Sequence, residues 1–530
     1  MSLLKKMCIF APHSFKRHNT VLGSTITITT SDKGVNLQKE HLRILRKRFD
    51  DCRGLGGGLA FEFKIEMNKN HIIMKRILTI LLVTIVLISC QTDSEKADKL
   101  RLGNKFDEAA ELYQKAADEG DAYAMWRLSN AYANGDGVDW DETKALELLK
   151  QSAQAGCEEA KCGLAFAYIF DWYNIGKDEE KGKEILEGLI KQTKNSTVLS
   201  LYAGLMFIGD GPYEEDQEKA MRVLKKVEDK DNPFYLDLMG AIYTSGTDEI
   251  EVDAEKAIEY YTKAFENGRK YSAYILQSIY TAGYGEIKAD KAKRIEWLNR
   301  GIESNVLDCM VDMALLSIIE DSTYKDMHNP QKAIDLLKRA ARHGSGKAYY
   351  TMGNLFYESK YLPKDDNKAF ENWKKAVELK YHQAASNLAY AYIDGVGCDK
   401  DMAKGIELHK LAVDNGSGFS ANKLFYCYLN GIWGVKKDKE LAKTYLLKAA
   451  KFDDPWGCYN LGRQYFMGND IVNKDYTQAF VYIKKAADMG LVDACRSLAY
   501  LYENGIGIDK NPQKAKEYRD KTIANENKKN

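Results

Sequence analysis

Side chains that could bind a metal or carry out catalysis are few and scattered in this chain of 530 residues. The histidines beyond residue 105 are His328, His343, His382 and His409. None of them belongs to an H-x-x-x-H or H-E-x-x-H pair, the spacing that places two zinc ligands on one helix face. No G-x-x-x-x-G-K-[ST] phosphate loop occurs either. We therefore expect no metal site and no cofactor.

One short stretch does match a catalytic motif. Ser322-Thr-Tyr-Lys325 has the S-x-x-K spacing of the nucleophile in β-lactamases. The K-T-G and S-D-N motifs that accompany it in those enzymes are missing beyond residue 90, so a chance match is the better interpretation. We expect no enzymatic activity. The alternative is a repeat-containing cell-wall or β-lactam hydrolase, which would require a clustered catalytic site.

The charge composition excludes further classes of protein. The chain has 77 Lys and Arg against 77 Asp and Glu, so it lacks the basic excess of a nucleic-acid binder and the single-sign excess of a disordered tail. Charged residues make up 29% of the chain and only seven residues are proline, which favours long helices over a β architecture. The partner is therefore not expected to be nucleic acid.

The segment from Met74 to Cys90 combines a positive head, an apolar run and a terminal cysteine. Lys75 and Arg76 precede the run 77–88, which at 12 residues is shorter than the roughly 20 that a membrane-spanning helix needs. It has the length of a signal-peptide core. The sequence Leu-Ile-Ser-Cys at 87–90 resembles the lipobox of bacterial lipoproteins, and this resemblance implies that Cys90 becomes the first mature residue and carries lipid.

This resemblance sets the expected organisation of the N-terminal region. We expect a lipoprotein signal peptide over 67–89, with translation starting at Met67 or Met74, and a polar tether over 90–105. Residues 1–66 would then be a non-native or disordered extension; the alternative is a genuine basic region before an uncleaved anchor. Gln91 after the cysteine implies an outer-membrane lipoprotein facing the periplasm or the cell surface. If the signal interpretation fails, a cytosolic adaptor is expected.

A repeat of about 37 residues fills the rest of the chain. An aromatic residue recurs at steps of 36 to 39 residues in eleven repeats, with Ile318 replacing it in the sixth. The aligned residues are Tyr132, Tyr168, Phe207, Tyr243, Tyr280, Ile318, Phe356, Tyr392, Tyr428, Tyr465 and Tyr502. A period of this size indicates a repeat architecture.

Each repeat reads as two helices. The first ends at a Gly-x-Gly turn, and the second begins with Lys-Ala at positions 144, 219, 256, 291, 332, 368 and 514. A glycine closes the second helix at positions 120, 156, 268, 344, 416 and 490, as expected for a left-handed residue after a helix end. The residue three before the aromatic is small in eight of the eleven repeats, which predicts a close helix crossing there; Gln277, Leu315 and Phe425 are the exceptions.

These marks together resemble the Sel-one-like repeat family, relatives of the tetratricopeptide repeats. The resemblance covers about 106–525 and implies an all-α fold, an α/α superhelical solenoid of about eleven two-helix repeats, with a disordered tail over 526–530. Repeats two, three and six depart most from the pattern, and irregular geometry is expected in the sixth, where a long connection spans 320–330. Such an array serves as a protein-binding scaffold in related repeats, whose first helices line the concave side.

A candidate protein-binding groove follows from residues two and six before each aromatic, which share a helix face. The set is rich in Tyr, Asn and Arg, and Tyr and Arg are enriched at binding hot spots. It comprises Trp126, Asn130, Tyr274, Tyr350, Asn354, Tyr390, Asn422, Tyr426, Tyr459, Arg463, Arg496 and Tyr500. We expect the groove in repeats seven to eleven to bind another protein or a peptide; the alternative is that the tyrosines fill gaps between helices.

The cysteines predict packing rather than cross-linking. Removing Cys8, Cys52 and Cys90 from the total of ten leaves an odd number. Cys458 and Cys495 occupy equivalent repeat positions, but neighbouring first helices are normally 8–10 Å apart, farther than the roughly 7 Å between Cα atoms that a disulfide allows. We therefore interpret both as small buried residues.

Overall fold

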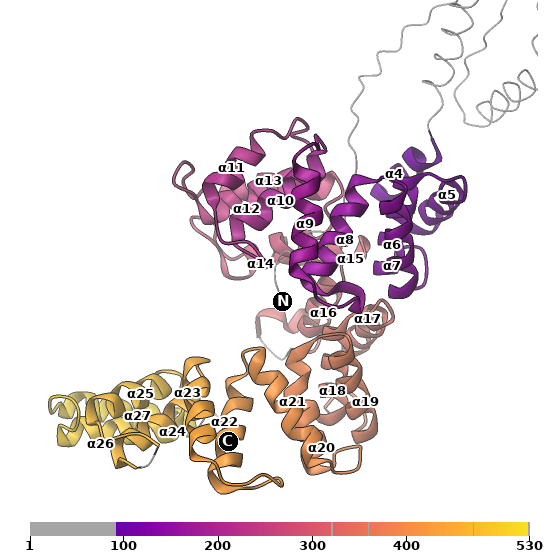
Figure 1. The fold of residues 1–530 in the computed structure, drawn as a ribbon. Helices are drawn as coiled ribbons and strands as arrows, with labels where there is room; N and C mark the ends of the chain where they lie inside the picture. Colours follow the sequence, from indigo (N-terminus) through magenta and orange to yellow (C-terminus); the bar gives the residue numbers. More distant parts are fainter. Residues whose placement is uncertain (1–91, 320–321, 359, 470, 528–530) are drawn as a thin grey trace, which may run out of the picture. The chain divides into compact units, whose positions relative to one another are not determined.

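The computed structural model describes residues 92–319, 322–358, 360–469 and 471–527 (Figure 1). The predicted extension over 1–66, the signal peptide over 67–89 and the lipidation site Cys90 lie outside these residues. In the described residues α-helices follow one another from α4 to α27, with short 3₁₀ helices between some of them and no strand. No helix in this part of the chain is long and apolar enough to cross a membrane. The all-α repeat fold predicted from the sequence is confirmed.

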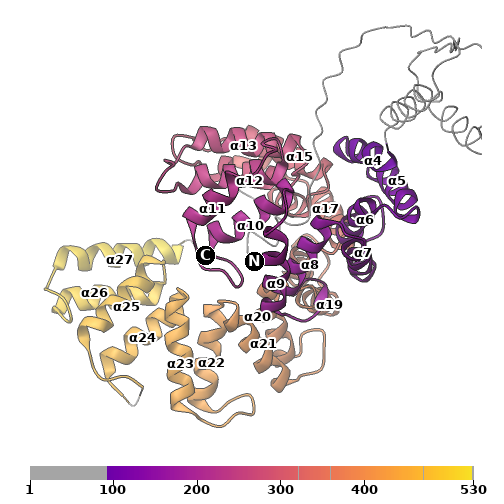
Figure 2. The same cartoon turned by 45° about the horizontal axis from the view of Figure 1, so that its top comes forward.

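The chain divides into an N-terminal body that ends at Asp290 and a C-terminal body that starts at Lys291. We call the even-numbered helices A helices and the odd-numbered ones B helices, and repeat one begins at α6. Within each body the paired helices of a repeat lie side by side (Figure 2). The N-terminal body contains α4 (Asp93–Leu102), α5 (Phe106–Asp118), α6 (Ala122–Asn134), α7 (Glu142–Gln154), α8 (Glu158–Phe170), η1 (Trp172–Asn174), α9 (Glu179–Ile190), α10 (Ser196–Ile208), α11 (Gln217–Leu224), α12 (Pro233–Ser245), α13 (Ala254–Glu266) and α14 (Ser272–Ala282).

The C-terminal body continues the same alternation. It contains α15 (Lys291–Glu303), α16 (Leu307–Leu316), η2 (Ser322–Met327), α17 (Pro330–Arg342), α18 (Gly346–Glu358), α19 (Asp366–Glu378), η3 (His382–Ala384), α20 (Ala385–Asp394), α21 (Met402–Asp414), α22 (Gly418–Asn430), α23 (Lys439–Lys451), α24 (Pro455–Met467), α25 (Tyr476–Asp488), α26 (Val492–Asn504) and α27 (Pro512–Asn527). Helix α27 runs two residues into the predicted tail, because 526 and 527 are still helical.

The predicted tether is wrong, because most of it is helix α4. Thr92 caps this helix in a reciprocal capping box with Glu95. Ala97 is fully buried against the next helix, and the Ser94 hydroxyl donates to a carboxylate oxygen of Asp121. Helix α4 thus pairs with α5 as an additional A and B pair in front of repeat one. In the described part of the chain, eleven such pairs each lie within one body, while α14 and α15 belong to different bodies.

One polar residue before each B helix connects the two helices of a repeat. In all eleven repeats its backbone N–H donates to a carbonyl at the end of the A helix, at 2.8 to 3.1 Å, from Asp141 to Tyr132 in repeat one through Asn511 to Tyr502 in repeat eleven. In ten of them the Asp or Asn side chain also accepts from a backbone N–H in the first turn of the B helix. The residue therefore satisfies polar groups of both helix ends.

These hydrogen bonds correct the alignment of repeats three and six. The accepting carbonyl belongs to the aligned aromatic in nine repeats, but to Met206 rather than Phe207 in repeat three and to Ser317 rather than Ile318 in repeat six. Moving repeat six back by one residue places Ala314, which is fully buried, at the small position and leaves Leu315 40% exposed. The apparent exception at Leu315 was therefore an alignment error, caused by the missing aromatic.

The lysine of the Lys-Ala motif covers the repeat aromatic. Its ammonium lies over the ring in repeats one, four, seven and eleven, at 4.2 Å for Lys144 over Tyr132 and 5.4 Å for Lys514 over Tyr502. The alanines at positions 145, 220, 257, 333, 369 and 515 are fully buried. Ala292 is exposed, because it follows Asp290 by two residues instead of four, so Lys291-Ala292 is not an equivalent of this motif.

Small residues set how closely the two helices of a repeat approach. A Cβ on Gly353 would lie 2.5 Å from the Trp373 ring, and one on Gly462 would lie 2.7 Å from Ile483, both on the B helix of the same repeat. Repeat two keeps a small A-helix residue, Ala165, and has Gly182 in place of the B-helix alanine, which makes room for Ile169 of the A helix. The predicted close crossing is confirmed. In repeat two the space left by Gly182 is filled by the larger side chain of Ile169.

The second glycine of the Gly-x-Gly turn contacts the preceding repeat. Gly397 has a φ of +67°, and a Cβ there would lie 2.0 Å from the carbonyl oxygen of Asp366, the first residue of the preceding B helix. Gly137 and Gly507 stand in the same relation to Phe106 and Tyr476. The sequence predicted a turn glycine within each repeat; the structure adds that this glycine allows the backbones of successive repeats to touch.

The predicted packing role of the cysteines is confirmed. Cys458 and Cys495 are fully buried and free, and each Sγ lies against a carbonyl oxygen of the preceding B helix, Ala450 at 3.7 Å and Ala487 at 3.6 Å. Burial raises the pKa of the Cys458 thiol to about 11, which keeps it protonated and unreactive at neutral pH.

We predict that Gly397→Ala destabilises the chain far more than Gly416→Ala. Both glycines have a positive φ, but the added methyl group meets backbone atoms only at Gly397 and has open space at Gly416. Left-handed strain alone costs about 1–2 kcal/mol, and the clash should add about 2 kcal/mol or more. Urea unfolding of the two variants measures the difference, and equal midpoints would contradict the proposed contact between repeats.

A buried histidine in repeat eight predicts acid sensitivity. His409 is 2% exposed, its Nδ1 lies 2.8 Å from the Ser420 Oγ, and its ring stacks on Trp433. Burial, assisted by the charge of Lys423, lowers its pKa to about 4. Because the unfolded chain binds this proton near pH 6.5, stability should fall by up to about 3 kcal/mol as the pH drops from 6.5 to 4.

His409→Gln should remove this part of the pH dependence while keeping a group that can hydrogen-bond to Ser420. The check is the free energy of unfolding measured between pH 4 and 8 for both proteins. Identical slopes below pH 6.5 would show that His409 does not titrate as its burial requires.

Candidate functional site

The predicted groove residues all lie on A helices. In the C-terminal body α18 carries Tyr350 and Asn354, α20 carries Tyr390, α22 carries Asn422 and Tyr426, α24 carries Tyr459 and Arg463, and α26 carries Arg496 and Tyr500. In the N-terminal body α6 carries Trp126 and Asn130, and α14 carries Tyr274. We describe the predicted residues of each body as a set of its own.

Burial divides the predicted residues into three groups. Tyr390, Tyr426 and Tyr500 are 39%, 37% and 53% exposed, and Arg463 and Arg496 are exposed as well. Half-buried residues are Asn130, Tyr274, Tyr350, Asn354 and Tyr459. Trp126 and Asn422 are buried at 3% and 7% exposure, which corrects their assignment to an exposed surface. Trp126 packs in the core, where its large apolar ring is more stable than in water.

The asparagines connect successive A helices. Asn354 accepts a hydrogen bond from Trp373 Nε1 at 2.9 Å and another from Asn387 Nδ2 on the next A helix at 2.8 Å. In repeats nine and ten, Asn460 donates to Asn422 at 3.0 Å and accepts from the Tyr426 hydroxyl at 3.0 Å. These asparagines therefore fix the spacing of the A helices, and sequence reasoning missed the partners Asn387 and Asn460, which both stand five residues before the aromatic.

The tyrosines and arginines use some of their polar atoms within the array. The hydroxyls of Tyr459 and of Ser497 on the next A helix are hydrogen-bonded, with their oxygens 3.0 Å apart. The Arg463 guanidinium lies 5.7 Å from the Tyr459 ring centroid. Arg496 pairs with Asp493 on its own helix at 2.7 Å, with a side chain that is still 56% exposed. The alternative that tyrosines fill gaps thus holds for Tyr459, while Tyr426 and Tyr500 also present ring surface to solvent.

Two exposed aromatic residues were missed by the sequence analysis. Phe419 and Trp456 are 51% and 45% exposed, and they stand seven residues before Tyr426 and Arg463 on the same helices. Residues seven apart share a helix face. The sequence position that could have revealed these two residues is therefore the one nine before the repeat aromatic. We call Phe419, Tyr426, Trp456, Arg463 and Tyr500 the A-helix face of repeats nine to eleven.

This face has the chemistry of a protein contact. Large exposed aromatic side chains on neighbouring helices are unusual unless a partner covers them, and Trp, Tyr and Arg dominate binding energies at interfaces. Lys423 lies 5.1 Å from the Phe419 ring centroid and, with Arg463, makes the face basic. In the described residues no three His, Cys, Asp or Glu side chains are close enough to hold a metal ion.

The sequence matches the Sel1 repeat at residues 104–121, 122–157, 236–268, 318–345, 346–381, 382–417, 418–451, 457–491 and 492–518, together more than half of its length. The chain belongs to the Sel1 repeat family. The stretches 158–235 and 269–317 are not matched, and they hold repeats two, three and five and the whole of α16, the A helix of repeat six. Repeats two, three and six are the ones whose sequence departs most from the pattern, and repeat five is unmatched as well.

Several curated proteins are similar over part of their length. An exopolysaccharide production negative regulator of Rhizobium leguminosarum bv. viciae is 42% identical over 10% of this chain and 20% of its own length. Cytochrome c oxidase assembly factor 7A of Xenopus laevis is 30% identical over 16% and 37%, and a chitin synthase regulator of Saccharomyces cerevisiae is 29% identical over 37% and 30%. The chain spans less than two fifths of each relative.

Solved structures of Sel1-repeat proteins also resemble the chain. A protective antigen of uropathogenic Escherichia coli with this fold is 21% identical, with a TM-score of 0.41, over 79% of this chain and 89% of the antigen. A Sel1 repeat protein from Oxalobacter formigenes is 23% identical, with a TM-score of 0.38, over 63% of this chain and 91% of its own.

Proposed function

We propose that this chain is a non-catalytic scaffold that binds another protein through the A-helix face of repeats nine to eleven. The observation that carries the proposal is the row of exposed Phe419, Tyr426, Trp456 and Tyr500 on three successive A helices. Hydrogen bonds between those helices hold the row in place, so binding would cost little ordering of the scaffold. Relatives named as regulators and an assembly factor support a role in controlling other proteins.

We propose further that lipid on Cys90 holds this scaffold at a membrane of the bacterial cell envelope. The support is the sequence: a positive head, an apolar run of signal-peptide length and the lipobox-like Leu-Ile-Ser-Cys at 87–90. An outer-membrane location follows from Gln91 by the same resemblance. Only Gln91 and Thr92 separate Cys90 from Asp93, the first residue of α4, so the repeats would stay close to the lipid surface.

We predict that replacing Tyr426, Arg463 and Arg496 together by alanine weakens capture of the partner at least tenfold. Each side chain is exposed, so the variant should keep its helicity, although Tyr426→Ala leaves Asn460 without one hydrogen bond. The partner is first identified by crosslinking in cells, and its affinity for the purified chain is then measured.

The matched control replaces exposed apolar residues of B helices, Leu447 and Val481, which are 40% and 47% exposed. This variant should bind the partner as the unchanged protein does. If the control variant loses the partner and the A-helix variant keeps it, the binding face lies on the B helices and the proposal is wrong.

A separate measurement tests the anchor. The mass of the mature N-terminus from fractionated cells should correspond to a chain that starts at a diacylated Cys90. An unlipidated chain that retains residues 1–66 would contradict the lipoprotein proposal and favour a cytosolic adaptor, while leaving the binding face to its own test.

A further inference from the structure

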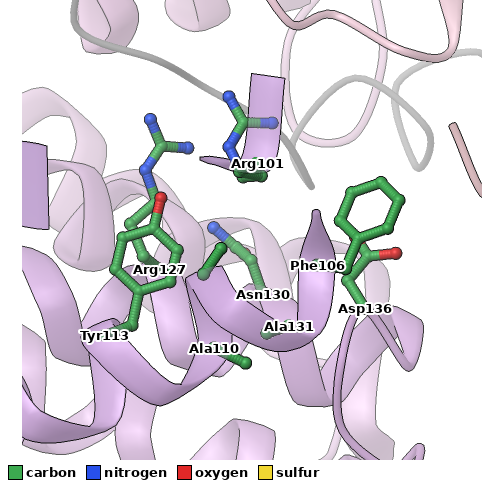
Figure 3. Close-up of a pocket in the computed structure, with 9 residues that line it drawn as sticks. Arg101, Phe106, Ala110, Tyr113, Arg127, Asn130, Ala131 and Asp136 are labelled. Carbon is green, nitrogen blue, oxygen red and sulfur yellow. The ribbon is translucent and has the colours of Figure 1, made fainter. Parts of the chain in front are cut away.

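A small cavity in the N-terminal body is surrounded by helices α4, α5 and α6 (Figure 3). Its volume of about 20 Å³ is slightly more than the space one water molecule needs. The walls include Ala109, Ala110, Ala131 and the ring of Phe106, while the polar groups come from Arg101, Asn130, Arg127 and Asp136. Figure 3 labels Arg101, Arg127 and Asn130 among the side chains that line this cavity.

Arg127 is fixed in the wall of this cavity by its Nε. The side chain is 2% exposed, and Nε lies 3.1 Å from a carboxylate oxygen of Asp98 and 2.7 Å from the Tyr123 hydroxyl. Asp98 in turn accepts hydrogen bonds from the hydroxyls of Tyr113 and Tyr123. The other end of the guanidinium can still donate hydrogen bonds, because Nη2 is buried and has no hydrogen-bond partner among the described residues.

Two more side chains in the cavity wall have buried donors without a partner. Nε and Nη2 of Arg101 and Nδ2 of Asn130 are buried and have no hydrogen-bond partner among the described residues. A buried donor that lacks a partner is destabilising, and more so when it is charged. Four such N–H-bearing atoms around one cavity therefore favour an acceptor that can take several hydrogen bonds at once.

Among the described residues, the charges around the cavity leave one positive charge without a negative partner. Asp98 faces Arg127, and Asp136 is held by Lys270, whose Nζ lies 2.7 and 2.9 Å from its two carboxylate oxygens. Arg101 is the third cation, and its charge opposes that of Lys270. A single monovalent anion would neutralise the excess. Asp136 does not oppose this, because its carboxylate already has a buried ammonium partner.

We propose that this cavity binds one carboxylate group of a peptide, held by Arg101, Arg127 and Asn130. A carboxylate carries the required single charge and can accept from two arginines in parallel. The volume admits only the oxygen end of such a group, so the rest of the peptide would lie outside the cavity, and a whole nucleotide or sugar does not fit. The proposal rests on the proposed scaffold function for the peptide nature of its ligand, and it adds a second contact in the N-terminal body.

The test uses the full chain with small carboxylate probes. Acetate, N-acetylalanine and the α-amide of N-acetylglutamate are titrated at constant ionic strength against chloride, with the ¹⁵N signals of arginine side chains as the readout. N-acetylalanine presents a chain-end carboxylate and the glutamate amide presents a side-chain carboxylate, so the tighter binder identifies the source. We expect saturable shifts of the Arg127 signal with all three probes.

Arg101→Gln should weaken probe binding at least tenfold, since it removes the unpaired positive charge while leaving the Asp98–Arg127 pair intact. The matched control is Arg222→Gln on α11 of the same body, where the arginine pairs only with the exposed Glu218, and its affinity should not change. Equal affinity in the Arg101 variant, no shift at Arg127, or tighter binding of inorganic phosphate than of any carboxylate would overturn the assignment.

The two proposals fail separately. Probe binding without capture of a protein partner would contradict the scaffold function and keep the carboxylate site. Capture of a protein partner that depends on Tyr426 and Arg463, without any probe binding, would contradict the carboxylate site and keep the scaffold function.

Discussion

The hydrogen bond from the residue before each B helix to the end of the preceding A helix is the constraint on which the array depends. It is formed in every one of the eleven repeats, and in ten of them the same side chain also starts the B helix. Once this bond fixes where the B helix begins, the buried alanine four residues later and the lysine over the aromatic ring take their positions. The helix crossing, and the small residues it requires, follow from that placement.

The same constraint supports the proposal that the A helices carry the binding surface. The B helices bury their alanine side against the A helices of their own repeats, and the Gly-x-Gly glycines bring successive repeats into backbone contact. Hydrogen bonds between asparagines connect the A helices of repeats seven and eight, through Asn354 and Asn387, and those of repeats nine and ten, through Asn422 and Asn460. The Tyr459–Ser497 hydrogen bond connects repeats ten and eleven. Exposed aromatic residues on such helices form a preorganised surface.

Much of the fold could be predicted from the sequence, because short-range rules dictate it. The repeat period, the helix-closing glycines with φ between 79° and 104°, the close crossings and the buried Cys458 and Cys495 all depend on residue type at a fixed spacing. The register of repeats three and six could not be predicted, since the marker residue at Phe207 and Ile318 misled the alignment. Helix α4 was missed because its short sequence is polar and only Ala97 and Ser94 are buried.

The candidate site was less predictable for a physical reason. Whether a tyrosine or asparagine faces solvent depends on the neighbouring repeat, as Asn422 and Tyr459 show by bonding to partners about 38 residues away. Phe419 and Trp456 stand nine residues before the repeat aromatic, whereas the sequence prediction used only the positions two and six before it. The carboxylate cavity depends on Arg101 in a helix that the sequence did not reveal.

The most direct test of the scaffold account is photo-crosslinking in intact cells from a benzophenone side chain placed at Tyr500 of the A-helix face. The same group at Leu447 on α23 serves as the reference position, since both side chains are exposed. The account predicts a discrete protein adduct from position 500 and none from position 447. An adduct from position 447 with none from position 500 would contradict the claim that the A helices carry the binding surface.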